Sequence, residues 1–287
     1  MSQRRLHFII NPIAGVKQKV RVVDELKKHL NPEFKYGIDF TEHADHATEL
    51  SIEAAHQGAE AVIAVGGDGT INEVAKALVG SEVSLGVIPM GSGNGFARHM
   101  GIPLKVQDAI SCINRFKLKC IDTGLANEEV FLSTVGLGFD AVVGKKFAEF
   151  GKRGLWSYMQ VSTQEFLKFV AQEYELLIDG RLLKTKAFLI NFANVGQYGN
   201  NAWIAPSASV TDGKLNLCII EEFPHHMVGD IVFKLFNKYL DKSKFYQSFL
   251  AEEIKVMNPS LYHIDGEPRE GSSLKVKVVP NSLNVIV

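Results

Sequence analysis

The chain of 287 residues is 46% hydrophobic, which is enough to bury a sizeable core in one large domain or two. Its 31 basic and 32 acidic residues give a formal net charge of -1, which excludes the overall positive charge typical of nucleic-acid-binding proteins. No segment approaches the roughly 20 apolar residues of a transmembrane helix, and three widely spaced cysteines without a CxxC pair indicate reduced core thiols. We therefore expect a cytoplasmic protein that meets any membrane only from outside.

The first 123 residues alternate short apolar runs with helical patterns. Strand-like runs at 6–10, 37–40, 61–65 and 85–89 are separated by apolar residues at helical spacing, at 16–30, at 44–57 and from Ile71 onward. This alternation predicts an α/β domain whose parallel sheet is covered by helices on both faces.

The pattern changes after about residue 124. An Asp-Gly turn at 179–180 joins two apolar-rich runs, as in a β-hairpin, and only two long helical patterns follow residue 124, near 156–171 and 225–241. Further strand-like runs lie at 214–220, 274–279 and 283–287.

We therefore predict an α/β domain over residues 1–124 and a mainly antiparallel β domain over 125–280. The active site is expected in the cleft between the two domains. The C-terminal tail, about 281–287, could pack back on the first domain.

A glycine-rich loop, GGDGT at residues 66–70, follows the third predicted strand and leads into a helix. Thr70 and Glu73 have the spacing of a capping box, which predicts that this helix starts at Thr70. Unpaired N–H groups at a helix start, beside glycines, form a site for a phosphate group. A carboxylate at Asp68 would repel phosphate unless a cation lies between them, so it indicates Mg²⁺ on a nucleotide. The alternative is a tight turn in which Asp68 is merely solvated.

Two more loops of related design, NPIAG at 11–15 and GSGN at 91–94, follow the first and fourth predicted strands. Loops at the carboxyl ends of parallel strands converge on the crevice where open α/β sheets bind ligands. Three such loops favour a phosphate site over an isolated turn. A dinucleotide-binding oxidoreductase is not favoured, because no GxGxxG fingerprint follows the first strand.

The motifs NPxxG, GGDGTINE and PxGSGN followed by FAR, in this order and spacing, resemble those of the diacylglycerol kinase catalytic family. This family includes bacterial lipid kinases and sphingosine kinases. GLGFDA at 136–141, APSASVTDGKLNL at 205–217 and HIDGEP at 263–268 also look like blocks of the family. The resemblance implies a Rossmann-like first domain, similar to those of NAD kinases and phosphofructokinases. It also implies a kinase that uses ATP and Mg²⁺ to phosphorylate a lipid hydroxyl, such as that of diacylglycerol.

The resemblance implies roles for individual residues as well. Those that match the nucleotide-binding motifs are Asn11, Thr41, Gly66, Gly67, Asp68, Gly69, Thr70, Ile71, Asn72, Ser92, Gly93 and Asn94. Asp265 and Glu267 match the acidic pair that holds the active-site carboxylate. Asp212, with the backbone carbonyls of Ser209 and Lys214, looks like a structural Mg²⁺ site of the family.

Phosphoryl transfer to an alcohol needs a metal to spread charge and a carboxylate to accept the hydroxyl proton. Asp68 can hold the metal, directly or through water, and either Asp265 or Glu267 can be the base. The alternative for IDGEP is a β-turn with exposed acidic side chains.

The lipid acceptor stays open in the sequence. Many bacterial relatives have Asp where this chain has Gly95, whereas sphingosine kinases lack an acid there, so diacylglycerol, a long-chain base and ceramide are all candidates. A soluble-metabolite kinase, such as an NAD kinase, is a less favoured alternative, and a catalytically weak lipid sensor is another.

A soluble lipid kinase must work at the membrane surface, so we expect peripheral, transient membrane association. Lys145, Lys146, Lys152 and Arg153 lie among aromatic residues in the segment 145–156, as in an interfacial segment, but a solvated helix with aromatic residues in the core is favoured.

The helix around 227–239 is expected to form core or lid rather than a lipid anchor. The pairs His43 with His46 and His225 with His226 have no Cys or further His ligands at metal spacing, so they do not predict a metal site. A homodimer is left open.

Overall fold

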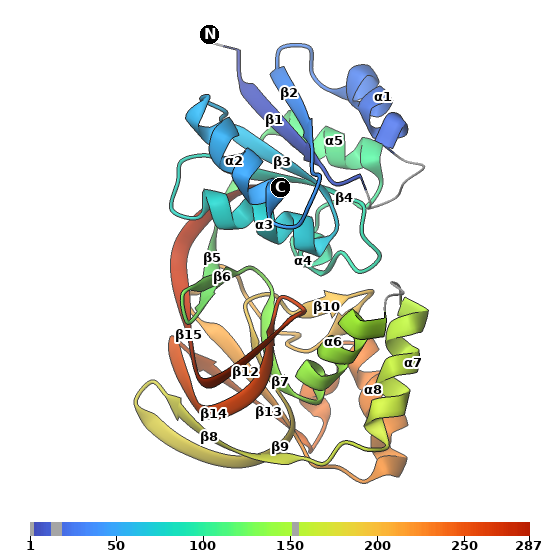
Figure 1. Cartoon of the computed structure of the whole chain (residues 1–287), viewed down its shortest axis with the longest axis vertical. Coiled ribbons are helices and arrows are strands. Elements are labelled where there is room, and N and C mark those ends of the chain that lie inside the picture. The colour runs from blue at the N-terminus through green and yellow to red at the C-terminus, as the bar shows by residue number, and fades with distance from the viewer. Residues whose placement is uncertain (1–2, 13–18, 151–154) are drawn as a thin grey trace. The chain divides into compact units, whose positions relative to one another are not determined.

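The computed structural model describes residues 3–12, 19–150 and 155–287 (Figure 1). The chain divides into two compact units: unit 1 contains Met1–Ile121 and Asn281–Val287, and unit 2 contains Asp122–Pro280. This division falls close to the boundary expected at residue 124. None of the described helices is long and apolar enough to cross a membrane.

Unit 1 is built on a parallel sheet with the strand order β2-β1-β3-β4, extended by the last residues of β15, whose Val285 pairs with Leu85. The strands are β1 (Arg5–Ile10), β2 (Lys35–Phe40), β3 (Ala61–Gly66), β4 (Ser84–Pro89) and β15 (Glu267–Ile286). The helices are α1 (Lys19–His29), α2 (His46–His56), α3 (Asp68–Leu78), α4 (Gly95–His99) and α5 (Val106–Arg115).

Helices cover both faces of this sheet. Leu6 and Phe8 of β1 share a core with Leu26 of α1 and Ile110 of α5. Ile9 points to the other face because side chains alternate along a strand, and α2 and α3 pack there against each other and against β3. The parallel pairing and the two helical layers agree with the alternation of strands and helices in the sequence.

Unit 2 is mainly antiparallel β-structure. Its strands are β5 (Leu118–Ala126), β6 (Glu129–Phe131), β7 (Thr134–Gly138), β8 (Gln172–Ile178), β9 (Arg181–Ala193), β10 (Gln197–Gly199), β11 (Ala202–Trp203), β12 (Leu215–Glu221), β13 (Tyr246–Ala251) and β14 (Glu253–Ile264), with most of β15. Its helices are α6 (Phe139–Phe150), α7 (Leu155–Phe166) and α8 (Val228–Phe236), with short 3-10 helices at His225–Met227 and Leu240–Lys242.

The strands β9 and β14 each pair with both β7 and β8, so these four strands close around a core. Leu137, Leu176, Phe192 and Ile254, one from each strand, are fully buried in that core. A second core lies under α8, where Ile231 packs with Phe223, with Cys218 of β12 and with Leu189 of β9.

Four expectations about local structure need correction. The helix α6 was not among the long helical patterns, although it is as long as α7. The two strands expected after residue 274 are one continuous strand, β15. Cys112 and Cys218 are buried but Cys120 is exposed, so the three thiols are not all in the core. The helix α3 starts at Asp68 rather than Thr70, for a reason given below.

Candidate functional site

The described residues of the predicted phosphate loops of unit 1 lie in direct contact, and residues 13–15 of the first loop lie outside the described part of the chain. The Asn11 side-chain amide donates to Thr70 Oγ1 at 3.0 Å, which links the first loop to GGDGT. The backbone of Gly67 approaches that of Gly91 so closely that a Cβ on Gly91 would lie 2.7 Å from Gly67 Cα, a contact that only glycine avoids. Asn94 fixes the third loop, because its side chain bonds both the N–H and the C=O of Gly91, at 2.9 and 2.8 Å.

Thr41 directly follows β2, the strand that pairs with β1. It is 7% exposed, and its N–H donates to Ile10 C=O at 3.0 Å, beside Asn11. The structure therefore gathers Asn11, Thr41, Thr70 and Asn94 at the carboxyl ends of neighbouring parallel strands, where open α/β sheets bind ligands.

Asp68 connects the second loop to the third. Its carboxylate accepts the N–H of Phe96 at 3.3 Å, so it caps the start of the short helix α4. Burial raises the pKa of Asp68, and the surrounding backbone N–H groups act in the opposite direction. Asp68 is thus not the freely solvated carboxylate of a simple turn, and any metal it held would share it with these N–H groups.

The predicted capping box of α3 is wrong. The N-cap residue of α3 is Gly67, and no side-chain hydrogen bond caps the start of the helix. One oxygen of the Glu73 carboxylate accepts the N–H of Ala47, the second residue of α2, at 3.1 Å. The helix therefore begins two residues earlier, which places the N–H groups of Asp68 and Gly69 in its first turn, where helices leave donors unpaired.

Two features at the start of α3 suit a ligand: open space beside Gly69 and an unpaired polar atom on Asn72. A Cβ on Gly69 would meet nothing within 4 Å, so the loop is open there. The side-chain oxygen of Asn72 is buried and has no hydrogen-bond partner among the described residues. Buried polar atoms are usually paired, so this oxygen indicates a site that a water molecule, an ion or a ligand completes.

Unit 2 holds the second acidic motif at the tip of a hairpin. Asp265 and Gly266, both with positive φ (47° and 87°), form the two-residue turn between β14 and β15. The Asp265 carboxylate accepts three backbone N–H groups, from Leu132 at 2.8 Å, Ser133 at 2.9 Å and Thr134 at 2.8 Å. Burial nevertheless raises the pKa of Asp265 to about 6. The turn with exposed acids that the sequence allowed is therefore wrong for Asp265.

The hairpin at Asp179 and Gly180 provides an internal comparison. It has the same Asp-Gly turn with positive φ, as the sequence predicted, and its carboxylate accepts the N–H groups of Glu252 and Glu253. An Asp-Gly turn that binds backbone N–H groups is thus a recurring structural device in this chain. Asp265 differs from Asp179 in two ways: Asp265 is partly buried whereas Asp179 is exposed, and Asp265 lies beside an ionisable pair.

That pair is His263 with Asp140, which the sequence analysis did not assign to the site. Both side chains are buried, and His263 Nε2 lies 2.9 Å from Asp140 Oδ2. The same oxygen accepts from Asn191 at 3.1 Å and from the Tyr198 hydroxyl at 2.8 Å. Burial acts to raise the pKa of Asp140. The charge of His263 and the hydrogen bonds from His263, Tyr198 and Asn191 outweigh burial and hold this pKa below its usual value.

The pair is coupled to the turn. The positive charge of protonated His263 acts to lower the pKa of Asp265. Gly136 makes space for the pair, because a Cβ there would lie 2.3 Å from His263 Nε2. The blocks GLGFDA and HIDGEP, which resemblance singled out separately, therefore meet in one buried network.

Glu267 has a different environment from Asp265. Its carboxylate is 58% exposed and lies 3.0 Å from Arg269, which also binds Glu129 through two nitrogens, at 2.9 and 3.1 Å. The two candidate bases thus differ in environment: Asp265 is partly buried and bound by backbone N–H groups, whereas Glu267 is an exposed member of an ion pair.

The predicted Mg²⁺ loop is an exposed turn with a buried carboxylate beside it. Asp212 Oδ1 accepts the N–H of Lys214 at 3.1 Å, and Ser209 Oγ lies 3.3 Å from Thr211 Oγ1. Asp122, 1% exposed, accepts the N–H of Gly213 at 2.7 Å. Carboxylate and carbonyl oxygens are the donors that Mg²⁺ prefers, so the kinds of group at this turn would suit this ion. Sequence reasoning did not single out Asp122, whose carboxylate bonds the same turn.

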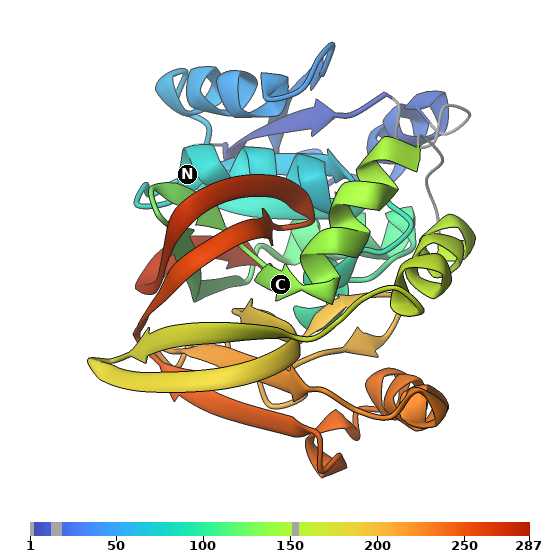
Figure 2. The same ribbon diagram turned by 60° about the horizontal axis from the view of Figure 1, so that its bottom comes forward.

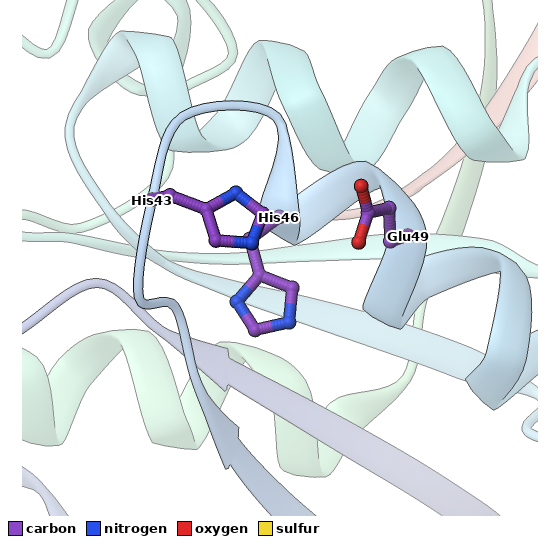
Figure 3. Close-up of side chains that lie close together, drawn as sticks. All are labelled: His43, His46 and Glu49. Carbon is purple, nitrogen blue, oxygen red and sulfur yellow. The ribbon is translucent and has the colours of Figure 1, made fainter.

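Another group of potential ligands, His43, His46 and Glu49, has its ligand atoms within 4.8 Å of one another (Figure 3). The two rings are stacked, with centroids 4.4 Å apart and planes at 12°. Nitrogen lone pairs lie in the ring planes, so two stacked rings do not direct them at one ion. His46 Nδ1 also accepts the N–H of Glu42 at 3.0 Å, which puts the proton of a neutral ring on Nε2. The arrangement is not a preformed metal site.

The basic and aromatic segment 145–156 is described only in part. Lys145 is paired with Glu270 at 2.7 Å and Lys146 with Glu149 at 3.0 Å. Lys152 and Arg153 lie outside the described residues. Its role at membranes stays a prediction.

Comparisons with known proteins agree with these motifs. Residues 5–126 match the model of the diacylglycerol kinase catalytic domain, and residues 133–287 match that of the YegS C-terminal NAD kinase beta sandwich-like domain. An uncharacterised protein of Synechocystis sp. is 31% identical over 97% of this chain and 69% of its own length. A "Probable lipid kinase YegS-like" protein of Pseudomonas fluorescens is 28% identical over 99% of this chain and 96% of its own.

Solved structures show the same fold. A diacylglycerol kinase structure from Bacillus anthracis str. Sterne has a TM-score of 0.73 at 20% identity and covers 99% of this chain and 96% of its own. A further structure from the same organism reaches a TM-score of 0.80 at 22% identity, over 100% and 98% of the two chains. At these identities the likeness concerns the fold alone.

Proposed function

The chain belongs to the diacylglycerol kinase catalytic family, whose members include lipid kinases, and on this premise we propose that it transfers the γ-phosphate of ATP to the hydroxyl group of a lipid. The observation that carries the proposal is Asp265, a partly buried carboxylate with a raised pKa, beside the buried pair His263–Asp140. A purely structural turn, such as the one at Asp179, needs neither feature.

The nucleotide would bind at the three loops of unit 1. The open space at Gly69 and the N–H groups in the first turn of α3 suit the phosphates of the nucleotide. The unpaired oxygen of Asn72 is a hydrogen-bond acceptor, so it suits a donor group rather than a phosphate. Asp68 and Asp265 belong to different units, so a cleft in which both act on one substrate is part of the proposal.

Asp265, rather than Glu267, is proposed as the general base. A base works best when its pKa lies near the operating pH, and the pKa of Asp265, about 6, meets that condition. The lipid oxygen would attack the γ-phosphorus while its proton passes to the Asp265 carboxylate, and ADP would leave. The three N–H groups from Leu132, Ser133 and Thr134 hold the carboxylate in place, and His263 and Asp140 position the turn.

Mg²⁺ is proposed at two places. When bound with ATP beside Asp68, it would spread the charge of the phosphates. In unit 2, Asp212 and Asp122, with the carbonyls of Ser209 and Lys214, would hold a second, structural ion. The first role concerns the reaction and the second the stability of unit 2.

Diacylglycerol is the lipid we favour, in line with the family, and sphingosine or ceramide is the alternative. Gly95 carries this ambiguity: it is the buried first residue of α4, beside the N–H groups that Asp68 caps. A soluble-metabolite kinase is less favoured, because the match extends through both family models.

The proposal is tested with three single variants and labelled ATP in lipid micelles. Asp265→Asn should reduce turnover to background while ATP binding persists, because the base alone is lost. Glu267→Gln should keep most activity. Asp179→Asn, a matched change in the other Asp-Gly turn, should be active as well. Full activity of Asp265→Asn would remove Asp265 from the mechanism.

A further inference from the structure

The helix α8 and the residues after it expose an unusual amount of apolar surface. Val232 is 45% exposed, Phe233 61%, Phe236 39% and Tyr239 55%. We call these four side chains the α8 face. Gly229, one turn before Val232 and Phe233, has nothing within 4 Å of an added Cβ, so the helix surface is open at that position.

The α8 face is not the side by which the helix joins the core. Ile231, 6% exposed, packs inward with the partly buried Val228 and Leu235. Residues 229, 232, 233 and 236 follow helical spacing on the other side. The helix is therefore apolar on both sides, with only the Asp230–Lys234 ion pair between them. Helices of this kind are normally covered on both sides.

The surroundings of the α8 face carry an excess of positive charge. Between residues 228 and 245 there are four lysines and two aspartates. Asp230 pairs with Lys234 at 2.7 Å and Asp241 with Lys242 at 3.2 Å, which leaves Lys238 and Lys244 in excess. Lys238 lies 3.5 Å from the centroid of the partly exposed Trp203 ring.

Exposed aromatic side chains bordered by lysines match a membrane interface in two respects. Phenylalanine and tyrosine rings insert at the boundary between headgroups and acyl chains, and lysines are attracted to anionic headgroups. In Figure 2 the helix, drawn in orange, lies at the edge of unit 2.

We propose that the α8 face docks the protein on anionic lipid bilayers. The proposal rests on the proposed function, since a lipid kinase must meet a substrate that stays in its bilayer. It replaces the expectation that this helix serves only as core or lid. It also assigns membrane contact to a surface other than the segment 145–156.

The test measures binding of the full chain to vesicles by sedimentation. Vesicles contain equal parts phosphatidylglycerol and phosphatidylcholine, or phosphatidylcholine alone. The wild type should bind the anionic vesicles more strongly, and binding should weaken as salt rises, since salt screens exposed charges. Phe233→Gln with Phe236→Gln should weaken binding at least about tenfold, because two rings no longer leave water.

A matched control separates this surface from apolar exposure in general. Phe249 and Leu250 of β13 are 37% and 54% exposed, similar to Phe236 and Phe233, but lie on a strand. Phe249→Gln with Leu250→Gln should leave vesicle binding unchanged. Equal losses in both double variants, or no loss in the α8 variant, would overturn the proposal.

Two further measurements separate the possible causes of failure. Sedimentation equilibrium without lipid reports whether the α8 face joins two copies; a wild-type dimer that the α8 variant dissociates would overturn membrane docking. Phosphorylation of a short-chain, water-dispersed diacylglycerol reports the proposed function without a bilayer. If the α8 variant keeps this activity but loses vesicle binding, docking is supported. If the wild type lacks lipid kinase activity and still binds vesicles through the α8 face, only the proposed function fails.

Discussion

The pH dependence of phosphoryl transfer should follow the ionisation of Asp265. The base must be a carboxylate to accept a proton, and burial raises its pKa from 3.8 to about 6. At pH 7 about nine-tenths of the molecules would carry the ionised base, and at pH 5 about one-tenth, so activity should fall roughly tenfold between these values. An aspartate with an ordinary pKa would stay almost fully ionised over the same range, and activity would barely change.

The same shift affects folding stability, with a definite sign. Because the folded-state pKa is raised, the contribution of Asp265 to stability is fully present below pH 3.8 and is lost as pH rises through about 6. The loss is at most about 3 kcal/mol, since Asp265 is partly exposed to solvent. Asp265→Asn removes this cost but leaves an N–H without its acceptor, which costs about 1–3 kcal/mol, so the variant should unfold at nearly the wild-type denaturant concentration at neutral pH.

The assay measures initial rates with saturating ATP, Mg²⁺ and micellar lipid across the acid range, with urea unfolding at each pH. The γ-phosphate also titrates near pH 6, so the residual activity of Asp265→Asn is the necessary control. A flat wild-type profile, or an acid limb that survives in the residual activity of Asp265→Asn, would refute the assignment of the base.

The other predictions concern the supporting structure. Gly91→Ala should lower the free energy of unfolding by about 1–3 kcal/mol, because the added methyl group meets the backbone of Gly67. Gly69→Ala should leave the free energy of unfolding unchanged but weaken ATP binding. Unchanged ATP affinity in calorimetry would contradict the phosphate site. His263→Gln should lower the free energy of unfolding in urea by about 3–5 kcal/mol, because it breaks the buried pair with Asp140. It should also move the acid limb of the activity profile to higher pH, because His263 lowers the pKa of Asp265. A limb that stays in place would leave His263 a purely structural role. Mg²⁺ should raise the melting temperature of the wild type and not that of Asp212→Ala; equal shifts would place the ion elsewhere.

The phosphate loops were predictable because local sequence determines them. Gly67 and Gly91 are required where two backbones meet, and Asn94 can hold its own loop through neighbouring backbone groups. Such contacts span a few residues, or follow from the rule that parallel strands end at one edge of a sheet. The sequence therefore indicates the loops and their convergence.

The local start of α3 was not predictable in the same way. Thr70 and Glu73 have the right spacing for a capping box, but Glu73 binds the N–H of Ala47 in another helix. A tertiary contact thus replaced a local one, and spacing alone cannot show which of the two a side chain makes.

The buried pair and the α8 face show two further limits. Asp140 and His263 are far apart in the chain, and only the pairing of β7 with β14 brings their strands together. For α8, apolar residues on both sides satisfy the pattern of a buried helix, and periodicity cannot tell which side the rest of the chain covers. The structure shows that Ile231 is covered and Phe233 is not.

The central claim is tested most directly by offering γ-labelled ATP and Mg²⁺ to the protein with a panel of acceptors. Diacylglycerol, monoacylglycerol, sphingosine, ceramide and phosphatidylglycerol are presented in mixed micelles, with NAD as the soluble acceptor. We expect label in a lipid product, diacylglycerol first, and its loss in Asp265→Asn but not in Asp179→Asn. Label in NAD alone would contradict the account.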